Sequence, residues 1–291
     1  MKRKPVIFTG LYLALLLVCT AWILLDQFVI SREMEPLQQT IPAALTAAPS
    51  VEAETPVAEP QITLSEIRIY DTTVHIADVQ ISDASYLRTA MANDTYGRNI
   101  KQTVAEMAEA NNALLAINGD YFGFRNSGYV IRNGILFRDD VYDSKQEDLC
   151  IWPDGRMTVI RENEISAHEL IEQGVWDVLS FGPMLVLNGE VQVSESLSVG
   201  TYSDDNPRTA IGMVEPLHYL FVVSDGRTDK DKGVTPFQLA ELMRDMGAQL
   251  AYNLDGGGSS TMVYEGEIIN FPTARGYWEE RRVSDIVYIG R

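Results

Sequence analysis

Apolar and polar residues alternate along several stretches of the chain, most clearly in "EIRIYDTTVHIADVQIS" at residues 66–82. Successive side chains of a strand point to opposite faces, so this alternation predicts strands with one buried face. Asn-Gly and Asp-Gly pairs, which favour tight hairpin turns, lie between apolar runs at residues 133–134, 154–155 and 188–189. The pattern therefore predicts hairpin-connected strands as the main elements.

Two segments instead carry apolar residues at helical spacing. The segment 100–111 places one apolar face at Ile100, Val104, Met107 and Ala108. The segment 235–246 starts with a Thr cap, has Pro at its first helical position and ends before Gly247. Each is followed by an apolar strand that ends in Asn, Asp and Gly. We predict an α+β fold, with a mixed or antiparallel sheet packed on these two principal helices.

The first 28 residues predict a membrane anchor. Three basic residues precede a run of 20 uncharged residues at positions 6–25. As a helix this run spans ~30 Å, the thickness of a bilayer's hydrocarbon core. Basic residues stay on the cytoplasmic side, so residues 1–28 predict a single-pass signal-anchor with the C-terminal domain outside the cytoplasm, at the cell membrane. A cleaved signal peptide is the alternative.

Composition divides the remainder of the chain. Residues 29–61 are rich in Pro, Ala and Glu, which predicts a disordered linker. Residues 62–291 are long enough for one domain with its own core. Cys150 is the only cysteine of that domain, so no internal disulfide is available. The net charge of −18 argues against a nucleic-acid partner, because phosphate backbones are held by clustered Lys and Arg.

Polar clusters interrupt the apolar sequence at four places. They are Asn118-Gly119-Asp120, Asn206-Pro207-Arg208-Thr209, Asp225-Gly226-Arg227, and Asp255 with Gly256, Gly257, Gly258, Ser259 and Ser260. A fifth, weaker cluster is Glu280-Arg281-Arg282. Singly, most have a plain structural interpretation as hairpin turns or surface ion pairs. Three consecutive glycines after an aspartate are harder to explain as a turn, because each one costs backbone entropy on folding.

Several familiar chemistries do not fit these clusters. A phosphate-binding loop needs a Lys after its glycines, and a serine-hydrolase elbow needs the pattern G-x-S-x-G. The three histidines form no H-E-x-x-H pair, and His75 fits a structural position in an alternating strand. Asp225, Asp229 and Asp231 depart from the spacing of a calcium loop. The sequence thus requires no cofactor, and it leaves a divalent cation open.

Carboxylates and arginines remain. A pair of carboxylates suits the cleavage of glycosidic bonds, in which one group meets the sugar carbon and the other handles protons. Arginine presents a planar fork of donors that matches phosphate oxygens. Backbone N–H groups of a glycine-rich turn can also receive an anion.

Five segments in this order carry a resemblance to a known family: "LLAINGDYF", "SFGPMLVLNGE", "NPRTAIGM", "SDGRTDKDKGVTPFQLAELMRDMGA" and "AYNLDGGGSSTMV". The chain resembles the phosphodiester glycosidase family over roughly residues 113–291. The resemblance implies hydrolysis of the bond between a sugar's anomeric carbon and a phosphodiester, in a phosphoglycan or another sugar-1-phosphodiester.

That chemistry suggests a role for each cluster. Asp255 is expected as nucleophile or general base, Asp120 as the second carboxylate, and Asn118 as the residue that orients the sugar or the carboxylates. Arg208 and Arg227 are expected to hold the phosphate. Further contacts to the substrate are expected from Thr209, Asp225, Gly256, Gly257, Gly258, Ser259 and Ser260.

Two other functions use the same residues. A surface module that binds phosphoglycans without cleaving them needs the arginines and glycines alone, although an acid beside a bound phosphate hinders mere binding. A metal-dependent phosphodiesterase would cut the other ester bond. The products formed with and without a chelator separate the three.

Overall fold

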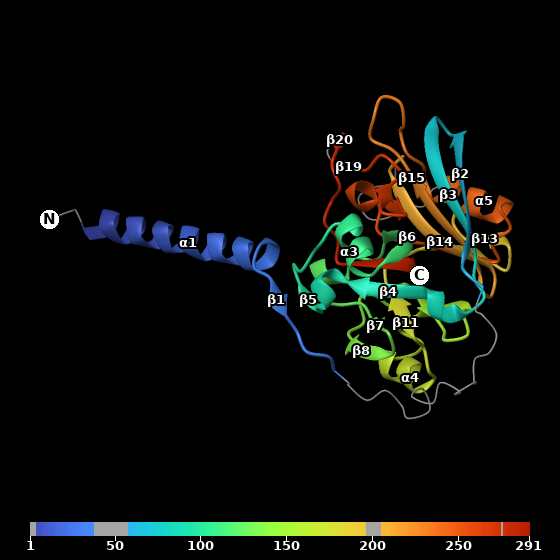
Figure 1. Cartoon of the computed structure of the whole chain (residues 1–291). Coiled ribbons are helices and arrows are strands. Elements are labelled where there is room, and N and C mark those ends of the chain that lie inside the picture. Colours follow the sequence, from blue (N-terminus) through green and yellow to red (C-terminus); the bar gives the residue numbers. More distant parts are fainter. Residues whose placement is uncertain (1–3, 38–57, 196–204, 275) are drawn as a thin grey trace.

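The computed structural model describes residues 4–37, 58–195, 205–274 and 276–291 (Figure 1). Its strands form three larger antiparallel sheets and two short ribbons. The α-helices are α1 (Lys4–Phe28), α3 (Val104–Ala110), α4 (Ala167–Glu172) and α5 (Pro236–Asp245). Short 3-10 turns are η1 (Ala84–Tyr86), η2 (Ala92–Asp94), η3 (Phe122–Phe124) and η4 (Gly257–Ser259).

The largest sheet has seven strands in the order β13-β12-β16-β14-β15-β3-β2. Their bounds are Glu190–Val191, Met184–Leu187, Leu250–Asn253, Arg208–Glu215, His218–Ser224, Thr72–Gln80 and Gln61–Ile69. A five-stranded sheet has the order β18-β17-β6-β21-β4. Its strands are Glu267–Ile268, Met262–Tyr264, Ala113–Asn118, Asp285–Gly290 and Leu87–Met91.

The third sheet has the order β10-β9-β11-β7-β8. Its strands are Met157–Arg161, Glu147–Ile151, Asp177–Leu179, Val130–Arg132 and Ile135–Arg138. The two ribbons pair β1 (Arg32–Glu33) with β5 (Gly97–Arg98), and β19 (Thr273–Ala274) with β20 (Tyr277–Trp278). The predicted hairpin signals at 133–134 and 188–189 join β7 to β8 and β12 to β13, and the one at 154–155 joins β9 to β10.

One apolar cluster joins the three larger sheets. It contains Phe221 of the first sheet, Ile117 of the second and Leu149 of the third, all fully buried. Removing this apolar surface from water is the main favourable term that holds the sheets together. The polar ends of the strands then lie at the rim of this shared core.

Each sheet is also covered by its own helix (Figure 1). α5 packs on the seven-stranded sheet, α3 on the second sheet and α4 on the third. The expected α5 begins at Pro236 after a capping box at Thr235, as its sequence indicates. The predicted helix at 100–111 starts later, at Val104, because Thr103 caps it. The expectation of two principal helices is not confirmed, since α4 covers a sheet of its own.

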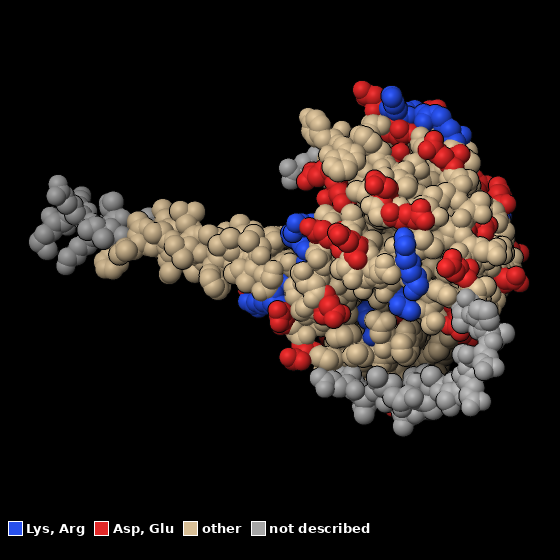
Figure 2. Space-filling model, in the orientation of Figure 1, with Lys and Arg blue, Asp and Glu red and all other residues tan. Residues whose placement is uncertain are grey.

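α1 is long and apolar enough to cross a membrane, by length and composition, over Gly10–Phe28. A signal sequence near an N-terminus passes the same test. In Figure 1 the helix projects away from the domain, and Figure 2 shows it largely free of charge beside a domain face with scattered acidic side chains.

The segment after α1 makes backbone hydrogen bonds to the domain, whereas the sequence predicts a disordered linker there. β1 pairs with β5, and the backbone N–H of Leu37 donates to the carbonyl of Leu136 at 2.9 Å. Residues at both ends of 32–37, within the predicted linker, therefore make backbone hydrogen bonds to the domain. The part of that linker at residues 38–57 lies outside the described residues.

Candidate active site

Strand ends from two sheets bring the predicted polar clusters together. β6 ends at Asn118 and β16 ends at Asn253, two residues before Asp255. The amide Nδ2 of Asn118 donates to the carbonyl of Asp255 at 2.6 Å, and the hydroxyl of Thr209 donates to Oδ1 of Asn118 at 2.8 Å. The clusters around residues 118, 209 and 255 are therefore neighbours, although 137 residues separate Asn118 from Asp255.

Asn118 is fully buried, and its side-chain amide holds the turn after β16 in place by hydrogen bonds. Its Oδ1 also accepts the backbone N–H of Thr261 at 3.3 Å. Because the amide contacts both sides of the glycine turn, it fixes where the Asp255 carboxylate lies. These contacts support a positioning role, whereas the predicted contact of Asn118 with the sugar stays a prediction.

Asp255 is only 8% exposed, and its Oδ2 accepts the hydroxyl of Ser259 at 2.6 Å. Burial raises the pKa of Asp255 to about 6, because a charged carboxylate loses hydration there. In this value the hydrogen bond from Ser259 and the positive charge of Arg281 offset part of the burial effect, and the charge of Asp120 adds to it. A carboxyl group with such a pKa can accept a proton near neutral pH.

Because glycine has no side chain, the segments that carry the arginines can approach this turn closely. A Cβ at Gly257 would lie 2.6 Å from Nη2 of Arg227, and one at Gly256 would lie 2.9 Å from the carbonyl oxygen of Pro207. Gly257 also has a φ of +63°, which favours glycine. Close packing against the segments that carry the arginines therefore explains why three glycines are needed here.

The same turn does not present the expected row of free donors. The N–H of Gly257 donates to Pro207 at 2.7 Å, and the N–H of Ser259 donates to Gly256 at 3.3 Å. These two N–H groups are therefore engaged within the protein, and the expected contact of this turn with an anion stays a prediction. The hydroxyl of Ser260 is buried and has no hydrogen-bond partner among the described residues, so it remains a candidate donor to a ligand.

Three arginines surround the glycine turn. Arg208 is buried, and its Nε donates to the carbonyl of Val234 at 3.1 Å. Burial, together with the nearby charge of Arg227, lowers the pKa of Arg208 to about 10. Two positive charges this close favour an anion beside them. Asn206 orients Arg227 by accepting from its Nε at 2.8 Å.

Arg281 is the third arginine, and the sequence placed it only in a weaker cluster. A Cβ at Gly258 would lie 3.4 Å from Cδ of Arg281. Arg281 is among the causes that hold down the pKa of Asp255, so its charge reaches the carboxylate. Its position just before the last strand was the only sequence signal for it.

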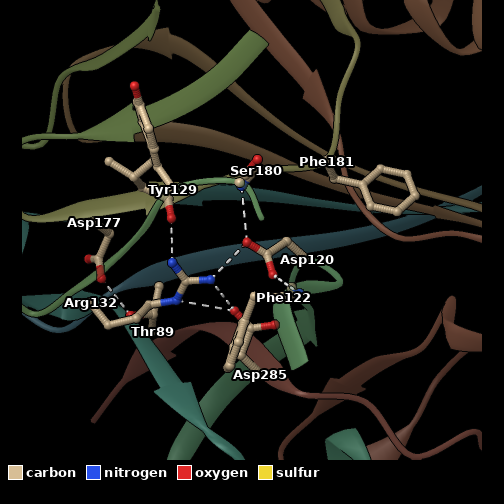
Figure 3. Close-up of polar contacts among 12 residues, drawn as sticks. Thr89, Asp120, Phe122, Tyr129, Arg132, Asp177, Ser180, Phe181 and Asp285 are labelled. Carbon is tan, nitrogen blue, oxygen red and sulfur yellow. Dashed lines mark hydrogen bonds and ion pairs between the residues drawn. The ribbon is translucent and has the colours of Figure 1, made fainter. Parts of the chain in front are cut away.

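Asp120 has a different environment from the one predicted. Its Oδ2 accepts Nη2 of Arg132 at 2.9 Å and the backbone N–H of Ser180 at 3.0 Å, while Oδ1 accepts the N–H of Phe122 at 2.8 Å. In Figure 3 the guanidinium of Arg132 lies between Asp120 and Asp285. With both oxygens occupied and 1% exposure, Asp120 is held in a structural ion-pair cluster.

Asp285 completes that cluster. Arg132 donates to its Oδ2 from Nη2 at 2.6 Å. Burial and the charge of Asp120 raise the pKa of Asp285 to about 7, whereas Arg132 lowers it. Burial alone would lower the pKa of Arg132, but Asp120 and Asp285 outweigh it and raise that pKa. The arginine therefore stays charged between two carboxyl groups.

Asp225 also bonds within the protein. Its Oδ2 lies 3.2 Å from Nε2 of His75, and its Oδ1 accepts the N–H of Phe271 at 2.8 Å. Asn270 joins this contact at 3.5 Å and donates to the carbonyl of Ser260 at 3.0 Å. The predicted direct contact of Asp225 with substrate is not favoured, because its oxygens tie the Arg227 turn to the glycine turn. His75 takes part in this link.

Among the described residues no group of three or more His, Cys, Asp or Glu could hold a metal ion. Asp231, considered above for a cation, instead accepts Arg68 at 2.9 Å and the N–H of Thr73 at 2.7 Å.

The sequence profile of the phosphodiester glycosidase family matches residues 111–290, which is more than half of the chain and contains all these clusters. The chain belongs to the phosphodiester glycosidase family.

Individual relatives agree with this membership. The chain is 30% identical over 181 residues to the SPbeta prophage-derived uncharacterized protein YomE of Bacillus subtilis, which covers 60% of this chain and 28% of that protein. It is 28% identical over 210 residues to human N-acetylglucosamine-1-phosphodiester alpha-N-acetylglucosaminidase, which covers 65% of this chain and 40% of the human protein. The chain thus spans less than half the length of these curated relatives.

A solved structure supports the fold. The catalytic domain of zebrafish N-acetylglucosamine-1-phosphodiester alpha-N-acetylglucosaminidase, described as auto-inhibited by its pro-peptide, superposes with a TM-score of 0.64 at 22% identity. The superposition covers 90% of this chain and 88% of the zebrafish chain.

Proposed function

We propose that this chain is a hydrolase that cleaves the bond between the anomeric carbon and the phosphate of a sugar-1-phosphodiester in a cell-surface or extracellular glycan. One observation carries the proposal: Arg208, Arg227 and Arg281 surround the glycine turn that holds the buried Asp255. Such a site offers positive charge to a phosphate and a carboxylate to the adjoining sugar carbon.

The arginines suit the leaving group. A departing phosphate monoester has a second pKa of ~6, so it leaves with little help from a proton donor. It needs instead cations that stabilise its growing negative charge, which the guanidinium groups of the buried Arg208, the half-buried Arg227 and the exposed Arg281 provide. This chemistry dispenses with the general acid of ordinary glycosidases, and Asp120 can remain in its ion-pair cluster as a positioning residue.

Asp255 suits the attack on the sugar. In one version its carboxylate forms a bond to the anomeric carbon, and water later hydrolyses the ester; in the other it takes a proton from the water that attacks. In both, the bond from carbon to the phosphate oxygen breaks and its electron pair leaves with the phosphate. The products are a free sugar and a phosphomonoester.

The apolar α1 supports a location at the cell membrane. We place α1 as a single-pass anchor, with its basic end in the cytoplasm and the glycosidase domain outside. The surface charge supports a glycan over a nucleic acid as partner, because acidic residues outnumber basic ones by 41 to 23. The mass of the mature chain isolated from membranes tests whether α1 is retained.

Product analysis tests the proposed reaction. The full chain in detergent micelles is incubated with a panel of hexose-1-phosphodiesters, with and without a chelator. The proposal expects free reducing sugar and phosphomonoester in both. Sugar-1-phosphate as product would contradict the proposal and indicate a phosphodiesterase. The same holds if sugar-1-phosphate forms only when the chelator is absent. Substrate that is bound but stays intact would indicate a module that binds the glycan without cleaving it.

A further inference from the structure

A small pocket lies where α1 meets the domain. Its volume is about 340 Å³, which is within the range of sites for small ligands. Its lining comes from the segment after α1, from the residues around β5 and from the segment before β21, and includes Ser31, Asn93, Thr95, Asn99, Lys101 and Arg282. The proposed reaction uses none of these side chains, so the pocket calls for a separate explanation.

Hydrogen bonds join the pocket to the end of α1. The buried amide of Asn99 donates through Nδ2 to the carbonyls of Gln27 at 3.2 Å and Ile30 at 3.0 Å. Gln27 carries one of the last four carbonyls of the helix, which have no partner within the helix itself. The hydroxyl of Ser31 donates to the carbonyl of Asn99 at 3.1 Å. The ribbon of β1 and β5 continues this attachment, so the helix end and the pocket wall form one unit.

This attachment sets the depth of the pocket relative to the bilayer that the proposed anchor would cross. The apolar span of α1 ends at Phe28, and Ser31 of the pocket follows three residues later. Three residues of chain reach at most ~10 Å. The polar headgroup layer is ~5–7 Å thick on each side of the hydrocarbon core. Figure 1 shows α1 leaving the domain beside β1 and β5, so the pocket wall begins at the level of the lipid headgroups.

The pocket carries positive charge in an acidic protein. Lys101 and Arg282 are exposed, and Glu33 is the one carboxylate among the described residues of the lining. Arg282 pairs with Glu106 at 3.2 Å, but both side chains are largely in water, where such a pair is weak. The lining thus has an excess of one positive charge in a chain whose net charge is −18. In Figure 2, basic side chains lie on both sides of the point where α1 leaves the domain.

An anionic phospholipid matches this pocket in charge and in place. Its phosphodiester has one negative charge for Lys101 and Arg282, and the polar groups of Ser31, Asn93 and Thr95 can bond the hydroxyls of a headgroup. A zwitterionic headgroup carries its own cation, which weakens the attraction. We propose that the pocket between α1 and the domain binds the headgroup of an anionic phospholipid. This inference rests on the proposed membrane location and is independent of the proposed reaction.

Native mass spectrometry of the full chain in detergent micelles tests this inference. The micelles contain equal amounts of phosphatidylglycerol and phosphatidylcholine, and we expect the chain to retain phosphatidylglycerol preferentially. Titration with phosphatidylglycerol then gives its apparent affinity. Lys101→Gln and Arg282→Gln should each lower this affinity roughly fivefold, which is the contribution of one basic residue near an anionic lipid. Lys101→Arg should keep it, because the charge is conserved.

Arg244→Gln is the matched control, since Arg244 forms an exposed ion pair with Glu241 outside this pocket. Its affinity for phosphatidylglycerol should equal that of the wild type. Equal retention of the two lipids, or an unchanged affinity in both pocket variants, overturns the inference. Glycerophosphoglycerol, the same headgroup without acyl chains, overturns it too if it competes as well as the lipid does, because the pocket then takes a soluble phosphodiester.

These results are separate from those that test the proposed function. A chain that cleaves a sugar-1-phosphodiester but shows no lipid preference keeps the proposed reaction and loses this inference. Preferential retention of phosphatidylglycerol that depends on Lys101 and Arg282 supports the inference even where no diester is cleaved. A mature chain that lacks α1 would overturn the proposed location and this inference together.

Discussion

Asp255 combines burial with a hydrogen bond from Ser259, and we expect this pairing to make the proposed activity depend on pH. The carboxylate has to be ionised to attack carbon or take a proton, and burial raises its pKa to about 6. We expect kcat/KM to rise with pH through about 6 and then level off. In Ser259→Ala the hydrogen bond that lowers this pKa is lost, so the rise moves to higher pH by about one unit.

The pH profile of kcat/KM for both proteins measures this shift. Ser82→Ala serves as the control, because the hydroxyl of Ser82 donates to the carbonyl of Ala58 at the surface. Superimposable profiles for wild type and Ser259→Ala would show that Asp255 is not the group whose ionisation limits activity.

Gly257 allows a contact that no other residue permits. An added methyl group would lie 2.6 Å from Nη2 of Arg227, on a backbone with positive φ. We expect Gly257→Ala to lose about 1–3 kcal/mol of unfolding free energy and to raise the KM for diester, because Arg227 is displaced. Gly266→Ala separates the two causes, since Gly266 has positive φ but open space around its Cβ position. Urea unfolding and steady-state kinetics that give the same result for both variants would contradict the steric cause.

The ion-pair cluster of Arg132 joins three strands, because it links β7 to Asp285 of β21 and to Asp120 after β6. Arg132→Met leaves two buried carboxyl groups without their cation. We expect it to cost about 3–5 kcal/mol of unfolding free energy. Arg161→Met at an exposed ion pair is expected to cost less than about 1 kcal/mol. Equal losses in urea titrations would contradict the structural role assigned to Asp120.

Elements with strong local signals could be predicted from the sequence, and those without could not. α5 was located because Thr235, Pro236 and Gln238 form a complete start signal. α4 has a similar capping box at Ser166, but its six residues are too few to show a helical period. The strand order depends on distant pairings, such as β16 between β12 and β14, which alternation in one strand cannot reveal.

The same limit applied to the site. The clusters that meet were found as motifs, because strand ends followed by Asn, Asp and Gly are visible locally. The partners of Asp120 and Asp225 were not visible in the sequence, since Arg132 and His75 reach them from other strands. Arg281 joins the turn from just before the last strand, and only packing shows that it reaches Asp255.

Buried carboxyl groups shape the stability of the whole domain. Burial raises the pKa of Asp148 well above its usual range, and the neighbouring charge of Glu162 raises it further. A raised pKa in the folded state gives stability that is complete below the unfolded pKa and lost as pH rises through the folded one. Asp255 and Asp285 act in the same direction, through about 6 and about 7. The unfolding free energy should therefore fall from pH 5 to pH 8.

Asp148→Asn should reduce that fall, because the buried group no longer has to ionise. Urea unfolding at pH 5 and pH 8 measures the difference, with Asp154→Asn at an exposed position as the control. A wild-type domain that gains stability between pH 5 and pH 8 would contradict this account.

At the scale of the whole molecule, we propose that α1 holds outside the cell a site in which arginines stabilise a leaving phosphate and Asp255 attacks the sugar carbon or activates water. The most direct test compares Asp255→Asn with wild type as full chains at pH 8, by release of reducing sugar from a hexose-1-phosphodiester. The variant should lose at least about a hundredfold in kcat and unfold at no lower urea concentration, since it buries a neutral amide in place of a charge. Near-normal turnover in a folded Asp255→Asn chain would contradict the central claim.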